Sequence, residues 1–276
     1  MIRRSRSLVL VATLAALPAL RAHAQAMPAA ADSSIPDRQL FHRSDLYVAA
    51  GFAAATIALL PADRHLAQLA RDEDLLNNGT LSRLSSDVKF FGGPGPYLIG
   101  AGLYAVGRLG HVPRMAELAL HGTEAVVVGS AVAGVIKVVA GRNRPYVSND
   151  ASPHDFSFGR GLRNDSSMSF PSGHATAAFS AAAAVVAETH EWWPRSTWYV
   201  APIMFGGATA VGLSRMYDNQ HWASDVVMGA AIGTFAGLKT VRFNHTHTGN
   251  RIDQALLGLR VVPTANGLAL ATGGAF

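Results

Sequence analysis

Residues 169–176 have the sequence Ser169-Phe170-Pro171-Ser172-Gly173-His174-Ala175-Thr176 and open an Ala-rich segment. The first N–H groups of a helix lack intrahelical partners and carry a partial positive charge. A helix beginning here would therefore offer an anion socket in which Ser172 and Gly173 line the N-terminus and His174 lies beside the anion. An ordinary helix cap is the alternative, since Ser is a preferred N-cap residue. The stretch alone leaves both interpretations open.

A second cluster, Lys137 and Arg144 with Pro145 after it, falls at the end of a helix expected over 115–140 and in the turn beyond it. Both side chains can face one anion, whereas Arg142 is expected to point to solvent. The alternative is positive charge placed at a helix C-terminus, where it is favourable by about 0.3–1 kcal/mol.

A third cluster holds His221 and Asp225, four residues apart at the start of a helix expected over 221–240. This spacing places both on one helix face. A carboxylate that binds one ring nitrogen leaves the other as a lone pair, which suits a nucleophile or a base. A purely structural His–Asp pair is the alternative. Arg215 follows Ser214 at the end of the preceding helix, expected over 197–216.

Together, the three clusters resemble the signature motifs of the type 2 phosphatidic acid phosphatase superfamily, which also includes bacterial acid phosphatases and vanadium haloperoxidases. The motifs occur in the family's order and spacing, and they cover residues 137–225. They read Lys137-x6-Arg144-Pro145, Pro171-Ser172-Gly173-His174 and Ser214-Arg215-x5-His221-x3-Asp225.

The resemblance implies a set of phosphate-binding residues, namely Lys137, Arg144, Ser172, Gly173 and Arg215, and a catalytic set, namely His174, His221 and Asp225. In the family's scheme His221 attacks phosphorus, Asp225 orients it, and His174 protonates the leaving oxygen. A fixed cage of cations can stabilise the charge of phosphoryl transfer. The expectation is therefore no metal and no cofactor, with vanadate able to occupy the phosphate site.

The function expected from this resemblance is a metal-independent phosphatase that hydrolyses phosphate monoesters or diphosphates through a phosphohistidine. A lipid-linked substrate, such as phosphatidate or a polyprenyl diphosphate, is favoured. Three alternatives stay open: a broad-specificity periplasmic acid phosphatase, a vanadate-dependent haloperoxidase, and a non-catalytic envelope protein that binds lipid phosphate. Simple binding needs only the cations, so the two histidines and Asp225 argue against the last of these.

The composition indicates an exported or membrane-associated protein. Hydrophobic residues make up 49% of the 276 residues and charged residues 15%, which is more apolar than a typical soluble domain. Three arginines before the apolar run Leu8–Leu20 predict a signal peptide over 1–26, with an uncleaved anchor as the alternative. The net charge of +5 comes from scattered residues, so the expected partner is a phosphate-bearing lipid or small phosphate ester, with membrane association and no nucleic acid.

The apolar periodicity predicts an all-α six-helix bundle. A linker over 27–43 precedes a helical phosphatase domain over 44–240, and a tail over 241–276 contains a possible β-hairpin at 256–264 and 268–272. The expected bundle helices cover 46–60, 97–106, 115–140, 173–189, 197–216 and 221–240, with solvated surface helices over 64–89.

Two further expectations concern the membrane and the remaining histidines. The uncharged runs 175–187 and 226–238 have thirteen residues each, short of the ~20 that span a bilayer, and only 196–214 is long enough. This favours an exported bundle, packed on itself or resting on a membrane, over six spans. His121 lies three residues before Glu124, which favours an intrahelical pair, and His245 falls in the polar tail, so no metal set is predicted.

Overall fold

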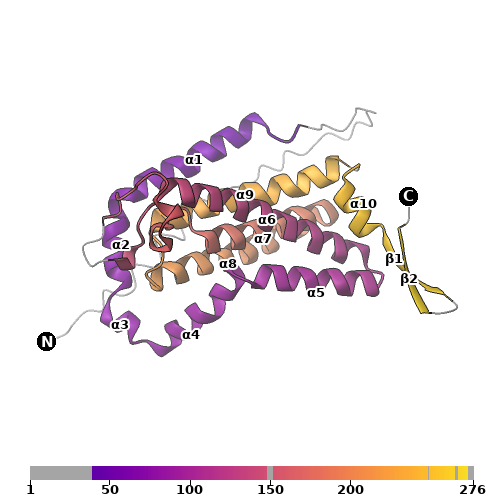
Figure 1. Ribbon diagram of the computed structural model, residues 1–276, viewed down its shortest axis with the longest axis horizontal. Helices are drawn as coiled ribbons and strands as arrows, with labels where there is room; N and C mark the ends of the chain where they lie inside the picture. Colours follow the sequence, from indigo (N-terminus) through magenta and orange to yellow (C-terminus); the bar gives the residue numbers. More distant parts are fainter. Residues whose placement is uncertain (1–38, 148–151, 248, 265–266, 273–276) are drawn as a thin grey trace. The chain divides into compact units, whose positions relative to one another are not determined.

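The computed structural model describes residues 39–147, 152–247, 249–264 and 267–272 (Figure 1). The predicted signal peptide and most of the predicted linker lie outside these residues.

Six long helices make up most of the described chain, so the all-α six-helix prediction is confirmed. Helix α7 packs against three of the others, α6, α8 and α9, and its contact with α9 is the most extensive in the protein. Both helices present small residues to each other: Ala175, Ala178 and Ala182 of α7 are buried with Ala223 and Ala230 of α9. Small side chains let the two backbones approach closely. The six helices are α1 (Arg43–Leu59), α5 (Gly95–Leu109), α6 (Pro113–Ala140), α7 (Gly173–Trp192), α8 (Thr197–Tyr217) and α9 (Ala223–Thr246).

Short helices connect α1 to α5, as the mixed charges of 64–89 predicted. They are η1 (Leu60–Ala62), α2 (Asp63–Ala70), α3 (Glu73–Leu76), α4 (Gly79–Val88) and η2 (Lys89–Gly92). Residues 77 and 78 separate α3 from α4, and the Asn78 side chain caps α4 by accepting hydrogen bonds from its first N–H groups. Asp63, at the start of α2, is fully buried.

The connection between α6 and α7 begins at Gly141, whose φ of 55° ends α6 in the left-handed region. Three short turns follow: η3 (Pro145–Val147), η4 (Arg160–Leu162) and η5 (Asp165–Ser167). The Arg160 guanidinium donates to the Gly141 carbonyl oxygen at 2.8 Å and to the Asp155 side chain at 3.0 Å. These bonds anchor the described part of the connection to the end of α6.

Beyond residue 240 the structure is more regular than predicted. Helix α9 continues to Thr246, so His245 lies on a helix, and α10 (Arg251–Leu257) follows. The predicted hairpin is present as β1 (Leu259–Thr264) and β2 (Gly267–Thr272), which pair antiparallel from Leu259↔Thr272 to Thr264↔Gly267.

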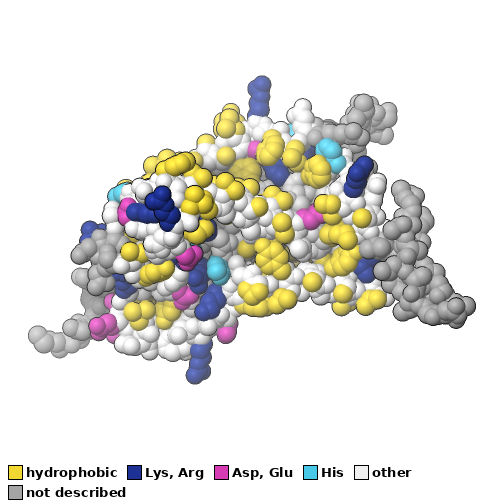
Figure 2. Space-filling model, in the orientation of Figure 1, with side chains coloured by type: hydrophobic (Ala, Val, Ile, Leu, Met, Phe, Trp, Pro, Cys, Tyr) yellow, Lys and Arg dark blue, Asp and Glu magenta, His cyan; other side chains and the backbone are white. Residues whose placement is uncertain are grey.

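Three helical segments are long and apolar enough to cross a membrane, judged by length and composition: 43–70, 113–140 and 223–246. The prediction that only 196–214 suffices was wrong, because counting uncharged runs ignores that a span tolerates a charge near its end. Large apolar side chains also lie exposed on the bundle, as the space-filling view shows over α5 and α6 (Figure 2). Leu98, Leu109, Val127 and Val135 are among them. Exposure on this scale fits contact with a membrane.

Candidate active site

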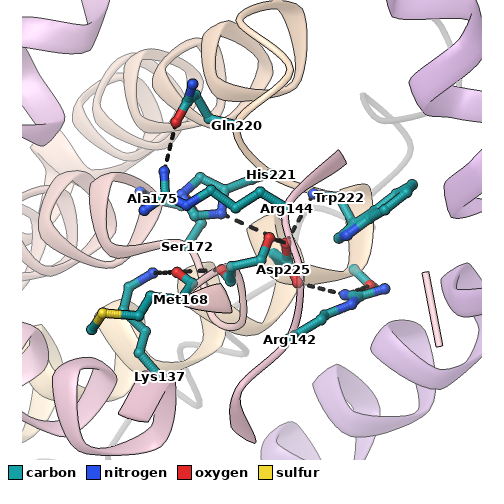
Figure 3. A network of polar contacts seen from close by, with 12 residues as sticks. Lys137, Arg142, Arg144, Met168, Ser172, Ala175, Gln220, His221, Trp222 and Asp225 are labelled. Carbon is teal, nitrogen blue, oxygen red and sulfur yellow. Dashed lines mark hydrogen bonds and ion pairs between the residues drawn. The ribbon is translucent and has the colours of Figure 1, made fainter. Parts of the chain in front are cut away.

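The predicted site residues converge where several helix ends meet. Lys137 lies in the last turn of α6, Ser172 caps α7, and Arg215 lies in the last turn of α8. His221 precedes α9, and Arg144 follows α6. Figure 3 shows Lys137, Arg144, Ser172, His221 and Asp225 gathered in one polar network. Residues as far as 88 positions apart in the chain, Lys137 and Asp225, are thus brought together by helix packing.

Ser172 is the N-cap of α7, so the cap interpretation is confirmed, while the anion socket at this helix end stays a prediction. Its hydroxyl oxygen accepts a hydrogen bond from the Ala175 N–H at 3.4 Å, and its own N–H donates to the Asp225 carbonyl oxygen at 2.9 Å. Lys137 lies against this helix end, because a Cβ on Gly173 would stand 3.4 Å from its Cε. The Lys137 ammonium donates to the Met168 carbonyl oxygen at 2.7 Å.

The two arginines are held through their terminal nitrogens, and one of those of Arg144 also lies 3.6 Å from the Asp165 carboxylate. Arg144 donates to the Gln220 side-chain oxygen at 2.5 Å, and Arg215 donates to Asp218 at 2.7 Å. The Nε atoms of both guanidinium groups are buried and have no hydrogen-bond partner. A buried donor without a partner is costly, so these N–H groups are available to an oxyanion.

His221 and Asp225 are neighbours, but they do not share a helix face as predicted. Helix α9 begins at Ala223, so His221 lies in the preceding turn while Asp225 occupies the first turn. The Nδ1 atom of His221 lies 3.6 Å from Oδ2 of Asp225. His221 is 4% exposed and Asp225 is fully buried. The pairing forms across the helix start, where the Asp225 carboxylate also accepts from the Trp222 N–H at 2.9 Å.

Arg142 does not point to solvent, and that prediction was wrong. Its side chain is fully buried and donates to Asp225, to Asp63 at 2.7 Å and to the Ser224 hydroxyl at 2.8 Å. Asp63 in turn accepts from the Ser224 N–H at 2.9 Å. Burial of an arginine requires paired carboxylates, and two are supplied. Arg142 therefore fixes Asp225 from the side away from His221.

The two histidines lie in surroundings that favour their neutral forms. Burial, followed by the positive charge of Arg215 and then of Lys137, lowers the pKa of His174 to about 4. Burial lowers the pKa of His221 to about 3, although its hydrogen-bonding interaction with Asp225 acts in the opposite direction. A neutral His221 retains a ring lone pair, as a nucleophile requires.

His174 packs against the Gly92-Gly93 segment that follows α4. A Cβ on Gly92 would stand 2.7 Å from the His174 carbonyl oxygen and 2.8 Å from its Cβ, and one on Gly93 would stand 3.5 Å from Nε2. The Gly92-Gly93 segment thus forms one wall around His174.

The structure brings together all eight site residues that the sequence indicated. It adds residues that the sequence analysis missed: Asp63, Arg142, Ser169, Asp218, Gln220 and Ser224. Ser169 lies two residues before the motif Pro171-Ser172-Gly173-His174, and its hydroxyl donates to Asp225 at 2.5 Å. The sequence could have indicated a role for Arg142 and Asp218, since each stands within three residues of a motif arginine. Nothing in the sequence around Asp63 indicates a role in the site.

Comparisons with known proteins agree with this geometry. The family model described as the PAP2 superfamily matches residues 119–248. An 84-residue segment is 43% identical to the lipid A 1-phosphatase of Porphyromonas gingivalis, and it covers 30% of this chain and 18% of that protein. The match therefore spans less than a fifth of the relative's length.

A solved structure shares the fold. The crystal structure of a transmembrane PAP2 type phosphatidylglycerolphosphate phosphatase from Bacillus subtilis matches with a TM-score of 0.52 and 22% identity, covering 75% of this chain and 96% of that one. Residues 119–248, which hold all three motifs, match the PAP2 superfamily model, and the helix arrangement agrees with the fold of that solved structure.

Proposed function

We propose that this protein is a metal-independent phosphatase that removes phosphate from monoesters or diphosphates of lipids. The observation that carries the proposal is the pair of buried, unpartnered Nε–H groups of Arg144 and Arg215 beside the buried His221. Lys137 and Arg144 both act electrostatically on His221, so cations and imidazole share one site. Such a cage fits the three equatorial oxygens of a transferring phosphoryl group.

The chemistry proceeds in two steps. The Nε2 lone pair of His221 attacks phosphorus, the bond from phosphorus to the leaving oxygen breaks, and that oxygen takes a proton from His174. Asp225 stabilises the positive charge on the His221 ring through Nδ1. Water then attacks the phosphohistidine, gives its proton to His174, and releases phosphate with His221 restored.

A lipid substrate is supported by the surface and by the relatives. The two similar proteins are a lipid A 1-phosphatase and a phosphatidylglycerolphosphate phosphatase, and both descriptions name a lipid phosphate. Three helical segments here have the length and composition of membrane spans. An open surface pocket of about 510 Å³ is lined by Asp218, which accepts a hydrogen bond from Arg215, and by Tyr146. We propose that part of the lipid headgroup lies there.

We further propose that the chain is exported and associates with the membrane, with its active end in the periplasm. Protease treatment of intact spheroplasts should cut the connection over 146–170. Complete protection of that segment would place the site on the other side.

The test of function is phosphate release by purified protein in EDTA. Phosphatidate, a polyprenyl diphosphate, phosphatidylglycerophosphate, lipid A and a small aryl phosphate form the substrate panel. We expect release from at least one lipid by the wild type and by His154→Ala, an exposed histidine, and none by His221→Ala. Equal release by His221→Ala and wild type would reject the proposed nucleophile. Bromide oxidation that needs added vanadate, with no phosphate release, would favour the haloperoxidase.

A further inference from the structure

A second cluster of histidines and carboxylates lies at the opposite ends of the same helices. It consists of His121 on α6, Glu188 on α7 and His245 on α9. Sixteen residues separate His121 from Lys137 along α6, and sixteen separate Ser172 from Glu188 along α7. At a rise of 1.5 Å per residue this is about 24 Å, so the cluster is separate from the phosphate cage.

The ligand atoms converge on one point. Nδ1 of His121 contacts one oxygen of Glu188, and Nε2 of His245 lies 2.9 Å from the other. All three ligand atoms fall within 4.8 Å of one another. Ligands of a tetrahedral zinc ion stand roughly 3.4 Å apart, given bonds of about 2.1 Å. On this scale the His245–Glu188 pair would need to open by about 0.5 Å around an ion, and the closer His121–Glu188 pair by more.

Asp253 on α10 approaches the ring nitrogen of His121 that does not face Glu188. Its Oδ2 lies 3.3 Å from Nε2 of His121, and its Oδ1 is buried without a partner. A carboxylate at this position accepts a hydrogen bond from Nε2–H of His121, which leaves the lone pair on Nδ1. Histidines that ligate metals are commonly oriented in this way by a carboxylate behind the ring.

Carboxylates gather around the two histidines of the cluster. Glu188 and Asp253 form their ion pairs, among the described residues, with histidines rather than with Lys or Arg. Glu117 stands one helical turn before His121 on α6. A divalent cation bound between the histidines would thus be faced by carboxylates that attract it.

We propose that His121, Glu188 and His245 bind a divalent transition-metal ion, with Zn²⁺ the best fit to two imidazoles and one carboxylate. Glu117 or water completes the coordination. Because His121 is 2% exposed and Glu188 fully buried, the ion fastens α6, α7 and α9 to one another rather than performing chemistry. The sequence pattern did not predict this site, because it indicated an intrahelical pair between His121 and Glu124. In the structure Glu124 instead accepts a hydrogen bond from Asn244 at 2.6 Å.

The test is metal retention by the full chain in detergent, with any affinity tag removed. Protein is incubated with Zn²⁺, passed through a desalting column, and its metal content and thermal midpoint are measured. We expect one equivalent of zinc per chain and a zinc-dependent rise in the midpoint. His121→Ala and His245→Ala should lose both the zinc and the rise. Co²⁺ bound to the wild type should show the visible absorption of a tetrahedral site.

Two controls separate this site from others. His190→Ala removes an exposed histidine near the end of α7, and His221→Ala removes one from the phosphate cage; both should retain the full equivalent. If His121→Ala does not fold, His245→Ala decides the question, because the His245 side chain is partly exposed and its loss should disturb the fold less. The proposal is overturned if the wild type retains no zinc, if folded His245→Ala retains as much as wild type, or if His221→Ala loses it. None of these results bears on phosphate release.

Discussion

His221 Nδ1 lies 3.6 Å from Asp225 Oδ2, a longer separation than any of the hydrogen bonds that hold this carboxylate. Asp225 accepts from Arg142, from the Ser169 hydroxyl at 2.5 Å and from the Trp222 N–H at 2.9 Å. The carboxylate is thus fixed before it meets the imidazole. A ring that gains positive charge during the reaction would be drawn toward an acceptor already in place.

Arg142→Gln should lower kcat about 100-fold with little change in KM, because the residue positions Asp225 and does not face the phosphate. Arg142→Lys should recover part of the loss. The variant also leaves Asp63 and Asp225 buried without their cation, which should lower the free energy of unfolding by about 3–5 kcal/mol. Steady-state kinetics and denaturant titration test this, with Arg163→Gln, an exposed arginine, as the control. A rise in KM with unchanged kcat would assign Arg142 to substrate binding instead.

The pH dependence follows from the lowered pKa of His174. In the free enzyme this ring loses its proton as the pH rises above about 4, so kcat/KM should fall between about pH 4 and pH 7. A bound phosphate dianion offsets the surrounding cations and raises the pKa of His174. The alkaline limb of kcat should therefore lie at higher pH than that of kcat/KM.

Ionisation of the substrate phosphate also changes the rate with pH. The variant His174→Gln separates the two effects, because it retains the dependence that comes from the substrate. This variant should lack the limb that belongs to the general acid. A profile identical to that of the wild type, or a flat wild-type profile over this range, would contradict the two-histidine scheme.

Arg215→Ala should reduce kcat by about 100- to 1,000-fold, the usual cost of removing one donor to a developing oxyanion. Arg215→Lys should remain impaired, because an ammonium cannot donate from both Nε and the terminal nitrogen that binds Asp218. Kinetics with a small aryl phosphate measure the effect without a membrane. Full activity of Arg215→Lys would show that charge alone suffices.

Gly92→Ala should cost about 1–3 kcal/mol of stability and displace His174, because the added Cβ would stand 2.6 Å from Val211 Cγ1 and 2.7 Å from the His174 carbonyl oxygen. Gly102→Ala is the matched control, since nothing lies within 4 Å of its Cβ position. Thermal midpoints and kcat of both variants provide the measurement. Equal thermal midpoints and equal kcat values for the two variants would show that the Gly92-Gly93 segment accommodates the added methyl group.

The sequence predicted the six helices and eight site residues because both depend on local pattern. Apolar periodicity and the breakers Gly141 and Pro145 locate helix ends, and the three motifs fall at those ends. Asp63 could not be predicted, since it meets Arg142 only after α2 packs beside α9. Charged residues are usually solvated, so a buried Arg142 between two carboxylates contradicts the default expectation.

The His121 cluster was missed for the same reason. Its members come from three helices, α6, α7 and α9, and the sequence spacing suggested only a neighbour on the same helix, Glu124. The extension of α9 to Thr246 is what brings His245 to Glu188. The polar composition after Lys239 led to the prediction that this helix ends at residue 240.

The most direct test of the central claim is to find the covalent intermediate. The protein is mixed with an aryl phosphate, whose leaving oxygen needs no proton, and is quenched in the steady state under conditions that preserve phosphohistidine. His174→Ala should accumulate the intermediate, because water then lacks its base. If His221 is the nucleophile, we expect peptide mass spectrometry to locate the phosphoryl group on His221. Turnover with no phosphoryl group on His221, or with one on a different residue, would contradict it.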